Sequence, residues 1–384
     1  MKINQLNIQW TYFKHICSFT RGVTYNKSNE VNKNSLNPWK VLRANNITQI
    51  CNILNFNEIK YIDSNVKVSN NQRLYKNDIL ICAASGSKDH IGKLAYINEN
   101  MNYIFGGFMG VIRSSSNIIN SKYLFYILSS NIFKDYLNKS INNSTIKNIS
   151  LSLINDFKIP VLPLKEQIKI INTLDVFTSL IYNLTKELDL RKQQYIYYRN
   201  KLFSFDSTVE YKYIDDVCFI ITGGELPKNY IKSSTPKDNY IYPLYSNAIG
   251  EKSIWGYSDS YKINKEAVTI SSVGTIGYPT LRKAYFTPII RLKTLIPKLE
   301  NNLNIKYLKY VLETINLNSN NSSLPNINSN MIKKIKIPVP NIHTQNNIVN
   351  TLDVFSEYIN KLNKEIALRL KQYKYYREKL LTFN

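Results

Sequence analysis

Two glycine-bearing turns contain residue types that can bind an anion or the edge of a base. They span Ala83–Gly92 and Ser271–Gly277 of the 384-residue chain, and each combines glycine with small hydroxyl side chains. A tight turn whose glycine needs a positive φ explains the same pattern, so both interpretations stay open. On the functional interpretation, backbone N–H groups and polar side chains donate to phosphate or base edges. The side chains concerned are Ser85, Lys88, Ser272 and Thr275.

Four arginines are further candidates, because arginine binds guanine through two parallel hydrogen bonds in the major groove. Arg43 and Arg282 lie in or near predicted loops, whereas Arg113 and Arg291 follow predicted strands at matched positions. A single arginine is more often a solvated or structural charge than a base reader. If the two halves of the chain recognise different sequences, equivalent positions should not carry the same base-reading residue. The equivalence of Arg113 and Arg291 therefore favours a structural role or a phosphate contact for both. Neighbouring polar residues complete the candidate DNA-binding set, namely Asn45, Ser246 and Asn247.

The sequence lacks the signatures of a catalytic centre. It contains no GxGxxG or GxxxxGK[ST] phosphate loop, no HExxH and no GxSxG. The acidic pair Asp215-Asp216 stands where the other half of the chain has Lys14-His15. The four cysteines have no CxxC spacing and the three histidines are scattered, whereas a zinc site needs clustered ligands. We therefore predict a binding protein without its own catalytic residues or metal.

The charge of the chain indicates a polyanionic partner. Fifty Lys and Arg residues against 27 Asp and Glu give a formal net charge of +23, which favours nucleic acid. An acidic membrane surface is the alternative, but no apolar run reaches the roughly 18 residues of a membrane span. The amino-terminal residues lack the apolar core of a signal peptide. We therefore expect a cytoplasmic protein that binds double-stranded DNA and no membrane.

The elements that must position these residues are organised around a long internal repeat. Lys158–Phe205 recurs without a gap as Lys336–Phe383, and the hexapeptide NTLDVF occurs in both copies. Apolar residues follow each other at alternating steps of three and four, which is the heptad pattern of a coiled coil. The seam residues are Leu174, Phe177, Leu184, Leu188 and Arg191 in the first copy and Leu352, Phe355, Leu362, Ile366 and Arg369 in the second.

Each copy therefore predicts one long helix of about 60 Å. The two seams can pack on each other, or each can dimerise with another molecule. Proline segments, Ile159–Gln167 and Ile337–Gln345, predict helix starts. The seam arginines need an acidic or carbonyl partner. The tyrosine-rich helix ends, Tyr195–Tyr198 and Tyr373–Tyr376, could stack on bases, but their heptad positions favour the seam. Basic residues off the seam are then free for phosphate or a partner: Arg199, Lys201, Arg377 and Lys379.

The remaining segments, 1–157 and 206–335, each predict an α+β domain, with the helices at 158–205 and 336–384. Short apolar runs between turns predict strands, at Asp78–Cys82, Lys93–Ile97, Phe108–Arg113, Ala267–Ile270, Tyr278–Phe286 and Ile289–Ile296. Apolar residues at helical spacing predict helices, at Ser121–Leu137 and Ile305–Ile315. The two domains are weakly similar to each other, so the whole chain predicts two related halves.

This arrangement resembles the specificity subunit of type I restriction–modification enzymes. The motifs that carry the resemblance are a proline-rich entry followed by Glu166-Gln167 and a long helix, repeated with Gln345 in the second copy. Thr344 stands where the family usually has Glu. The resemblance covers the entire chain and rests on the order domain, helix, domain, helix rather than on one motif.

The resemblance implies two target recognition domains joined by two antiparallel coiled-coil helices with pseudo-twofold symmetry. Each domain would read one half of a split asymmetric DNA site. The chain would bind no cofactor and would hold two methyltransferase subunits that use S-adenosylmethionine, with nuclease subunits that use ATP and Mg as possible further partners. The alternatives are a free-standing DNA-binding protein and a structural coiled-coil protein without modification partners.

Overall fold

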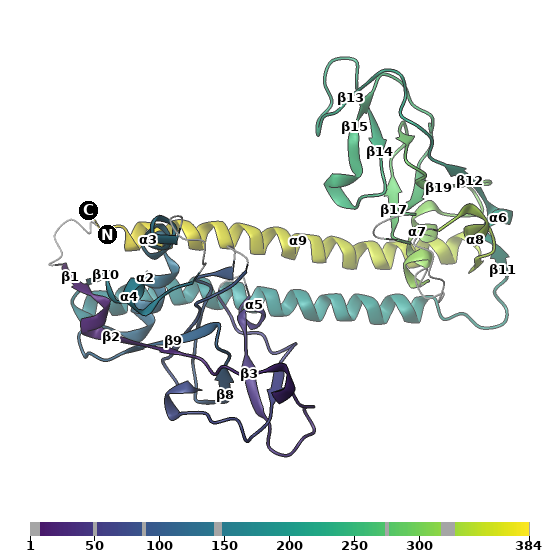
Figure 1. Ribbon diagram of the computed structural model, residues 1–384. Helices are drawn as coiled ribbons and strands as arrows, with labels where there is room; N and C mark the ends of the chain where they lie inside the picture. Colours follow the sequence, from purple (N-terminus) through teal and green to yellow (C-terminus); the bar gives the residue numbers. More distant parts are fainter. Residues whose placement is uncertain are drawn as a thin grey trace. The chain divides into compact units, whose positions relative to one another are not determined.

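The computed structural model describes residues 8–48, 52–86, 90–141, 148–272, 276–315 and 327–383. It consists of two compact units, shown in Figure 1, that divide both long helices between them. Unit 1 is Met1–Glu187 with Leu362–Asn384, and unit 2 is Leu188–Lys361. The predicted domain boundaries stay predictions, because these units meet inside the helices and not at the helix ends.

The globular part of unit 1, called the first domain, is α+β as predicted. Two four-stranded sheets form it, in the order β2 (Cys17–Arg21), β9 (Met109–Ser114), β6 (Ile79–Cys82), β7 (Leu94–Tyr96) and the order β4 (Lys60–Ile62), β3 (Trp39–Leu42), β8 (Met101–Phe105), β5 (Arg73–Leu74). A two-stranded sheet joins β1 (Gln9–Tyr12) to β10 (Lys158–Val161). Four helices complete it: α1 (Phe13–Ile16), α2 (Ser121–Ser129), α3 (Asn131–Ile141) and α4 (Leu151–Asn155).

The second domain, in unit 2, repeats the first of these sheets strand for strand, whereas its other sheet repeats three strands in the same order and has its fourth strand on the opposite edge. Its sheets have the order β12 (Cys218–Thr222), β19 (Lys293–Pro297), β16 (Ala267–Ile270), β17 (Pro279–Arg282) and the order β13 (Tyr230–Ile231), β15 (Ile254–Ser258), β14 (Tyr242–Tyr245), β18 (Thr287–Pro288). The two-stranded sheet joins β11 (Tyr211–Tyr213) to β20 (Lys336–Pro338). The helices are α6 (Ile214–Val217), α7 (Ile305–Thr314) and α8 (Ser329–Lys333). All residues of β6 and of β16 are buried, as an apolar run at the centre of a sheet requires.

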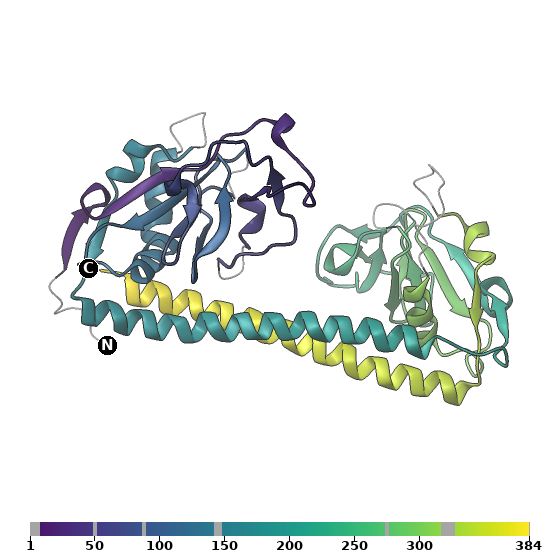
Figure 2. The same ribbon diagram turned by 90° about the horizontal axis from the view of Figure 1, so that it is seen from below.

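The long helices are α5 (Leu164–Leu202) and α9 (Ile342–Leu381), and each unit contains the start of one beside the end of the other (Figure 2). In unit 1 the ring of Phe177 stacks on that of Tyr376 at 5.2 Å, and in unit 2 the ring of Phe355 stacks on that of Tyr198 at 5.4 Å. These are the same two repeat positions with the helices exchanged. The prediction that the two seams of one chain pack on each other, antiparallel, is therefore confirmed.

The seam arginines have the partners that the sequence requires. The Arg191 guanidinium donates to Gln194 Oε1 at 2.9 Å and lies 5.2 Å from the Tyr358 ring centre. Arg369 forms an ion pair with Glu365 at 2.7 Å. The carboxylate that balances Arg369 thus comes from its own helix, one turn earlier.

The predicted helix starts are confirmed, because α5 begins at Leu164, inside Ile159–Gln167, and α9 begins at Ile342, inside Ile337–Gln345. Pro160 and Pro338 themselves lie in strands β10 and β20 just before the helices, where a two-stranded ribbon tolerates proline because one edge needs no N–H donor. Two other local predictions are wrong. The single helix predicted at Ser121–Leu137 is two helices, because Ser130 is extended and bonds back to Ile127 O. Arg377 is not free: its side chain is 11% exposed and pairs with Glu378.

The predicted match between Arg113 and Arg291 is also wrong. In β2–β9 Cys17 pairs with Ser114, and in β12–β19 the corresponding Cys218 pairs with Pro297. Counting back along the strands, Arg113 therefore corresponds to Ile296, and Arg291 corresponds to Phe108. The shared Ile-Arg dipeptide misled the sequence comparison, because the strand register and not residue identity fixes which positions are equivalent.

Candidate nucleic-acid interface

Each domain is fixed to its long helix by a repeated set of hydrogen bonds. The fully buried Gln167 accepts from Asn120 N at 2.8 Å and donates to the carbonyl oxygens of Ile118 and Leu162. In unit 2 the fully buried Gln345 makes the equivalent bonds to Asn304, Asn302 and Pro340. Glutamine, and not the preceding Glu166 or Thr344, therefore makes the contact that holds each domain on its helix.

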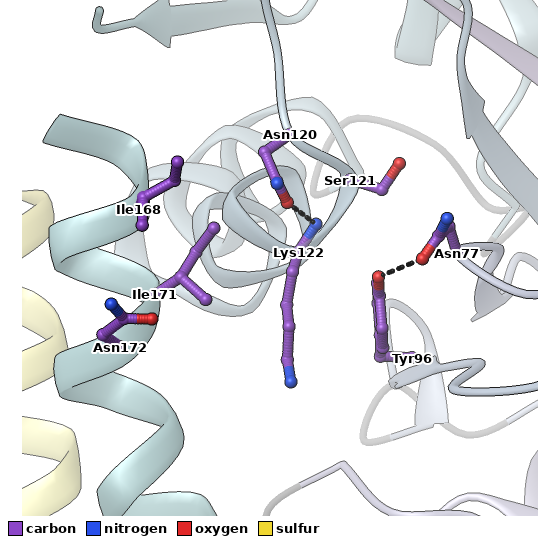
Figure 3. A pocket seen from close by; sticks show the side chains of 8 residues that line it. All are labelled: Asn77, Tyr96, Asn120, Ser121, Lys122, Ile168, Ile171 and Asn172. Carbon is purple, nitrogen blue, oxygen red and sulfur yellow. Dashed lines mark hydrogen bonds between the residues drawn. The ribbon is translucent and has the colours of Figure 1, made fainter. Parts of the chain in front are cut away.

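A polar pocket of about 420 Å³ lies beside this junction in unit 1 (Figure 3). Asn120, Lys122 and Tyr96 line its domain side, and Ile168 and Ile171 of α5 line the other. Lys122 is already paired with Asp175 of α5 at 2.9 Å, and Lys306 pairs with Asp353 in the same way in unit 2. Within the described residues, the Ser121 hydroxyl of this pocket bonds to no basic side chain, and Lys122 is held by Asp175, so we assign the polar residues of the pocket to the junction.

Three predicted site residues come together in the second domain. Asn247 Nδ2 donates to Ile290 O at 2.5 Å, and Asn247 Oδ1 accepts from Ser272 N at 2.8 Å. Ser272 Oγ donates to Arg291 O at 3.0 Å. Asn247 and Ser272 thus hold the backbone of Arg291, whose own side chain is exposed. The contact of these residues with DNA stays a prediction.

Arg282 and Ser246 form a separate, interior cluster. The Arg282 side chain is buried, donates to Thr269 Oγ1 and Ser253 Oγ at 3.0 Å each, and lies 4.0 Å from the Tyr245 ring centre. Burial lowers the pKa of the Arg282 guanidinium. Ser246 Oγ donates to Ser253 O at 3.4 Å. This arrangement gives Arg282 a structural role in the second domain.

In the first domain the predicted residues are more dispersed. Arg43 is half-buried, Asn45 is exposed and donates to Glu58 Oε2 at 3.0 Å, and Ser85 is half-buried beside the glycine turn. Gly92 and Gly277 both have positive φ, of 77° and 81°, so the turns do need glycine for their backbone, as the structural interpretation proposed. Lys88 and Thr275 lie outside the described residues.

Arg113 makes a structural ion pair. Its Nε and Nη2 donate to the two oxygens of Asp78, at 2.8 and 2.7 Å, and the Asp78 side chain is 4% exposed. Removing one partner of a buried pair leaves a buried charge uncompensated. We therefore expect Arg113→Met to lower the free energy of unfolding by about 3 kcal/mol, measured by urea denaturation, and to leave the salt dependence of DNA binding unchanged.

The control is the double variant Asp78→Asn with Arg113→Met, which removes both charges. It should recover part of the lost stability, because no buried carboxylate is left unpaired. A single Arg113→Met variant that is as stable as the parent chain but binds DNA more weakly would contradict the structural role.

The register places one exposed loop at the same point of both domains, immediately before β9 and β19. We call Gly107–Phe108 the first tip and Ile290–Arg291 the second tip. Phe108 is 75% exposed and Ile290 is 52% exposed. Gly22 N donates to Met109 O at 3.1 Å and Gly223 N donates to Leu292 O at 2.8 Å, which confirms that the tips are equivalent.

Sequence reasoning missed Phe108 and Ile290 as candidate contacts. The sequence did contain a signal for Phe108, since it lies in the run Gly106-Gly107-Phe108-Met109-Gly110. An aromatic residue on a turn within a glycine-rich run has few side-chain neighbours along the chain to cover it. No comparable signal marks Ile290, which lies within an apolar run that predicted a strand from Ile289 onward.

A family model described as the type I restriction modification DNA specificity domain matches residues 10–190 and, again, residues 206–372. The chain belongs to this family. A putative type I specificity subunit of Mycoplasma pneumoniae is 31% identical over 71% of this chain and 75% of its own length. The EcoR124I/EcoR124II specificity subunit of Escherichia coli is 31% identical over 65% of this chain and 66% of its own length.

Solved structures of the family share the fold. The type I restriction–modification S subunit of M. genitalium matches with a TM-score of 0.61 and 16% identity, over 100% of this chain and 98% of that chain. The chain is thus a type I specificity subunit with two related α+β domains and two long antiparallel helices. In the described part of the chain, no helix is long and apolar enough to span a membrane, and no group of three or more His, Cys, Asp or Glu side chains is placed to hold a metal ion.

Proposed function

We propose that each domain of this specificity subunit reads one half of a split asymmetric DNA site, and that the chain holds two methyltransferase subunits. The observation that carries the proposal is the pair of equivalent tips: the same scaffold presents Phe108 in one domain and Arg291 in the other. Domains that share their strand register but present different exposed side chains at the same point are suited to reading two different sequences. The net charge of +23 supplies attraction to phosphate.

The long helices support the partners in this proposal. Val176, Leu190 and Tyr197 of α5 are exposed apolar residues at one heptad position, and so are Val354, Leu368 and Tyr375 of α9. Each unit carries one such set, since Val176, Leu368 and Tyr375 belong to unit 1 and the other three residues belong to unit 2. Exposed apolar residues that recur in this way are typical of a protein–protein contact. Two equal sets fit two identical methyltransferase subunits.

Methylation chemistry would take place on the partners, which would supply S-adenosylmethionine binding and adenine methylation. Nuclease subunits that use ATP and Mg would join the same complex as further partners. The role of this chain is then to choose the DNA sequence and to place the partners on it. Nothing in the proposal requires a catalytic residue in the chain itself.

The test is co-expression of the chain with the methyltransferase encoded beside it, followed by genome-wide mapping of methyladenine. We expect a split motif with a constant gap. Exchanging residues 1–157 with those of another specificity subunit should alter one half of the motif, and exchanging residues 206–335 should alter the other half. A chain that forms no complex with the methyltransferase and adds no methylation would contradict the proposal.

A further inference from the structure

The second tip is held in a strained backbone conformation. Ile290 and Arg291 have consecutive positive φ angles of 53° and 60°, which are rare outside glycine and costly for a β-branched residue. Both amides donate to the chain opposite, Ile290 N to Gly224 O at 2.9 Å and Arg291 N to Gly223 O at 3.0 Å. With the carbonyl bonds from Asn247 and Ser272, both peptide groups of the second tip are satisfied, so its shape is fixed before any ligand binds.

The first tip is held at the same point by different atoms. Phe108 O accepts from Ala83 N and Ala84 N, both at 2.9 Å. Gly22 lies so close to this loop that a Cβ there would be 2.2 Å from Gly106 O, and a Cβ on the equivalent Gly223 would be 2.9 Å from the backbone of Ile289. Glycine in the opposing strand thus permits the close approach that fixes both tips. Each tip projects its side chain from a rigid base.

One further cation, Lys293, lies near Arg291 of the second tip. Lys293 is buried at the start of β19, and its Nζ donates to Thr222 Oγ1 at 3.0 Å. Its pKa is lowered by burial and by the charge of Arg291, so the two cations are close enough to repel each other. In the described part of the chain no carboxylate forms an ion pair with either cation, although Glu225 is near in sequence. An anionic ligand would relieve this repulsion.

The first tip presents an apolar surface instead. Phe108 makes no aromatic or cation–π contact within the described residues, and three quarters of its surface is exposed. A single exposed phenylalanine is unremarkable on a protein surface, but this one occupies the position of Arg291 and is held rigidly. A rigid exposed phenyl ring can contact the methyl group of thymine or wedge against a base step.

We propose that the two tips are specificity-determining DNA contacts: Arg291 binds guanine in the half-site read by the second domain, and Phe108 makes an apolar contact with a base in the half-site read by the first. The inference rests on the proposed function and adds to it the residues that differ between the two readers. The equivalence of Arg291 with Phe108, which follows from the strand registers, supports the proposal. Two domains that read different sequences should carry different side chains at equivalent positions.

The experiment is selection from a random-sequence duplex DNA library by the complex with the methyltransferase, with parent and variant chains compared. Arg291→Ala should relax one guanine position in one half-site and weaken binding to the parent site by about 10–100-fold. Arg291→Lys should keep the charge but lose the paired hydrogen bonds, and so should relax the same position. Phe108→Ala should relax one position in the other half-site only.

Matched controls lie at the opposite ends of the same strands. Lys298 is an exposed cation just beyond the end of β19, and Ile118 is an exposed apolar residue beyond the end of β9. Lys298→Ala and Ile118→Ala should leave the selected motif unchanged. Circular dichroism of each variant confirms that it is folded before selection.

The outcomes separate this inference from the proposed function. If the parent complex selects a split motif but Arg291→Ala and Phe108→Ala select the same motif as the parent, the tips do not determine specificity, and the proposed function stands. If Arg291→Ala weakens binding to all sequences equally, Arg291 contacts phosphate only, which also overturns its reading role. If the parent complex selects no split motif, the proposed function itself fails.

Discussion

Removing one heptad from each long helix is expected to abolish binding to the native DNA site and to create binding to a site whose gap is about three base pairs shorter. The deletion takes out Thr185–Arg191 from α5 and Asn363–Arg369 from α9. Seven residues correspond to about 10 Å of helix, which is about three base pairs of B-DNA. The seam stays in register. After the deletion Tyr195 is the fourth residue beyond Leu184, which is the position that Leu188 occupies in the parent chain.

The size of the effect follows from the linkage of two binding modules. When both domains engage one DNA molecule, the second contact is effectively intramolecular, and affinity is lost by about 100-fold or more if geometry forbids simultaneous binding. Electrophoretic mobility shift with duplexes that differ only in gap length measures the change. The parent chain should prefer the native gap, and the deletion variant the shorter one.

The control keeps the helix length and changes only the surface of the same segments. Lys186→Ala with Lys364→Ala should retain the native gap preference. If the shortened chain is folded and still prefers the native gap, the helices do not set the distance between the half-sites. In that case they would serve as a stalk for assembly and not as a spacer.

The long helices and their pairing were predictable from sequence because the signal is repeated. An unbroken heptad pattern over two equal segments constrains both length and packing face, and the stacked pairs Phe177–Tyr376 and Phe355–Tyr198 follow from it. Central strands were predictable for a related reason. Ile79–Cys82 is an uninterrupted apolar run and Ala267–Ile270 is broken only by Thr269; a short, largely apolar run between turn signals is typical of a fully buried strand.

The tips were not predictable, because their geometry depends on contacts distant in sequence. Nothing local indicates that Ile290 and Arg291 adopt positive φ, since β-branched and long side chains normally avoid it. The conformation exists because Gly223, Gly224, Asn247 and Ser272 bond to the loop from other parts of the domain. Sequence therefore identified Asn247 and Ser272 as polar candidates but could not show that they support Arg291.

Replacing the junction glutamines is expected to detach each domain from its helix separately. Gln167→Met keeps the size of the side chain but leaves the buried Leu162 carbonyl, and the partly buried Asn120 N–H and Ile118 carbonyl, without their partner. An unsatisfied buried group costs about 1–3 kcal/mol, and the two partly buried groups cost less because water can reach them, so the local stability of unit 1 should fall by about 3 kcal/mol. Hydrogen exchange followed by mass spectrometry should show faster exchange at Ile118–Ser129, while Asn302–Thr314 of unit 2 remains protected.

Gln345→Met should give the reverse result, with exposure of Asn302–Thr314 and protection of Ile118–Ser129, because the same three bonds recur there. Gln193→Met is the matched control: it lies on α5, is exposed, and should change neither segment. Loss of protection in both units from one substitution would mean that the junctions unfold together. If each substitution removes protection in its own unit only, the two junctions unfold independently. One recognition domain can then be exchanged without disturbing the other.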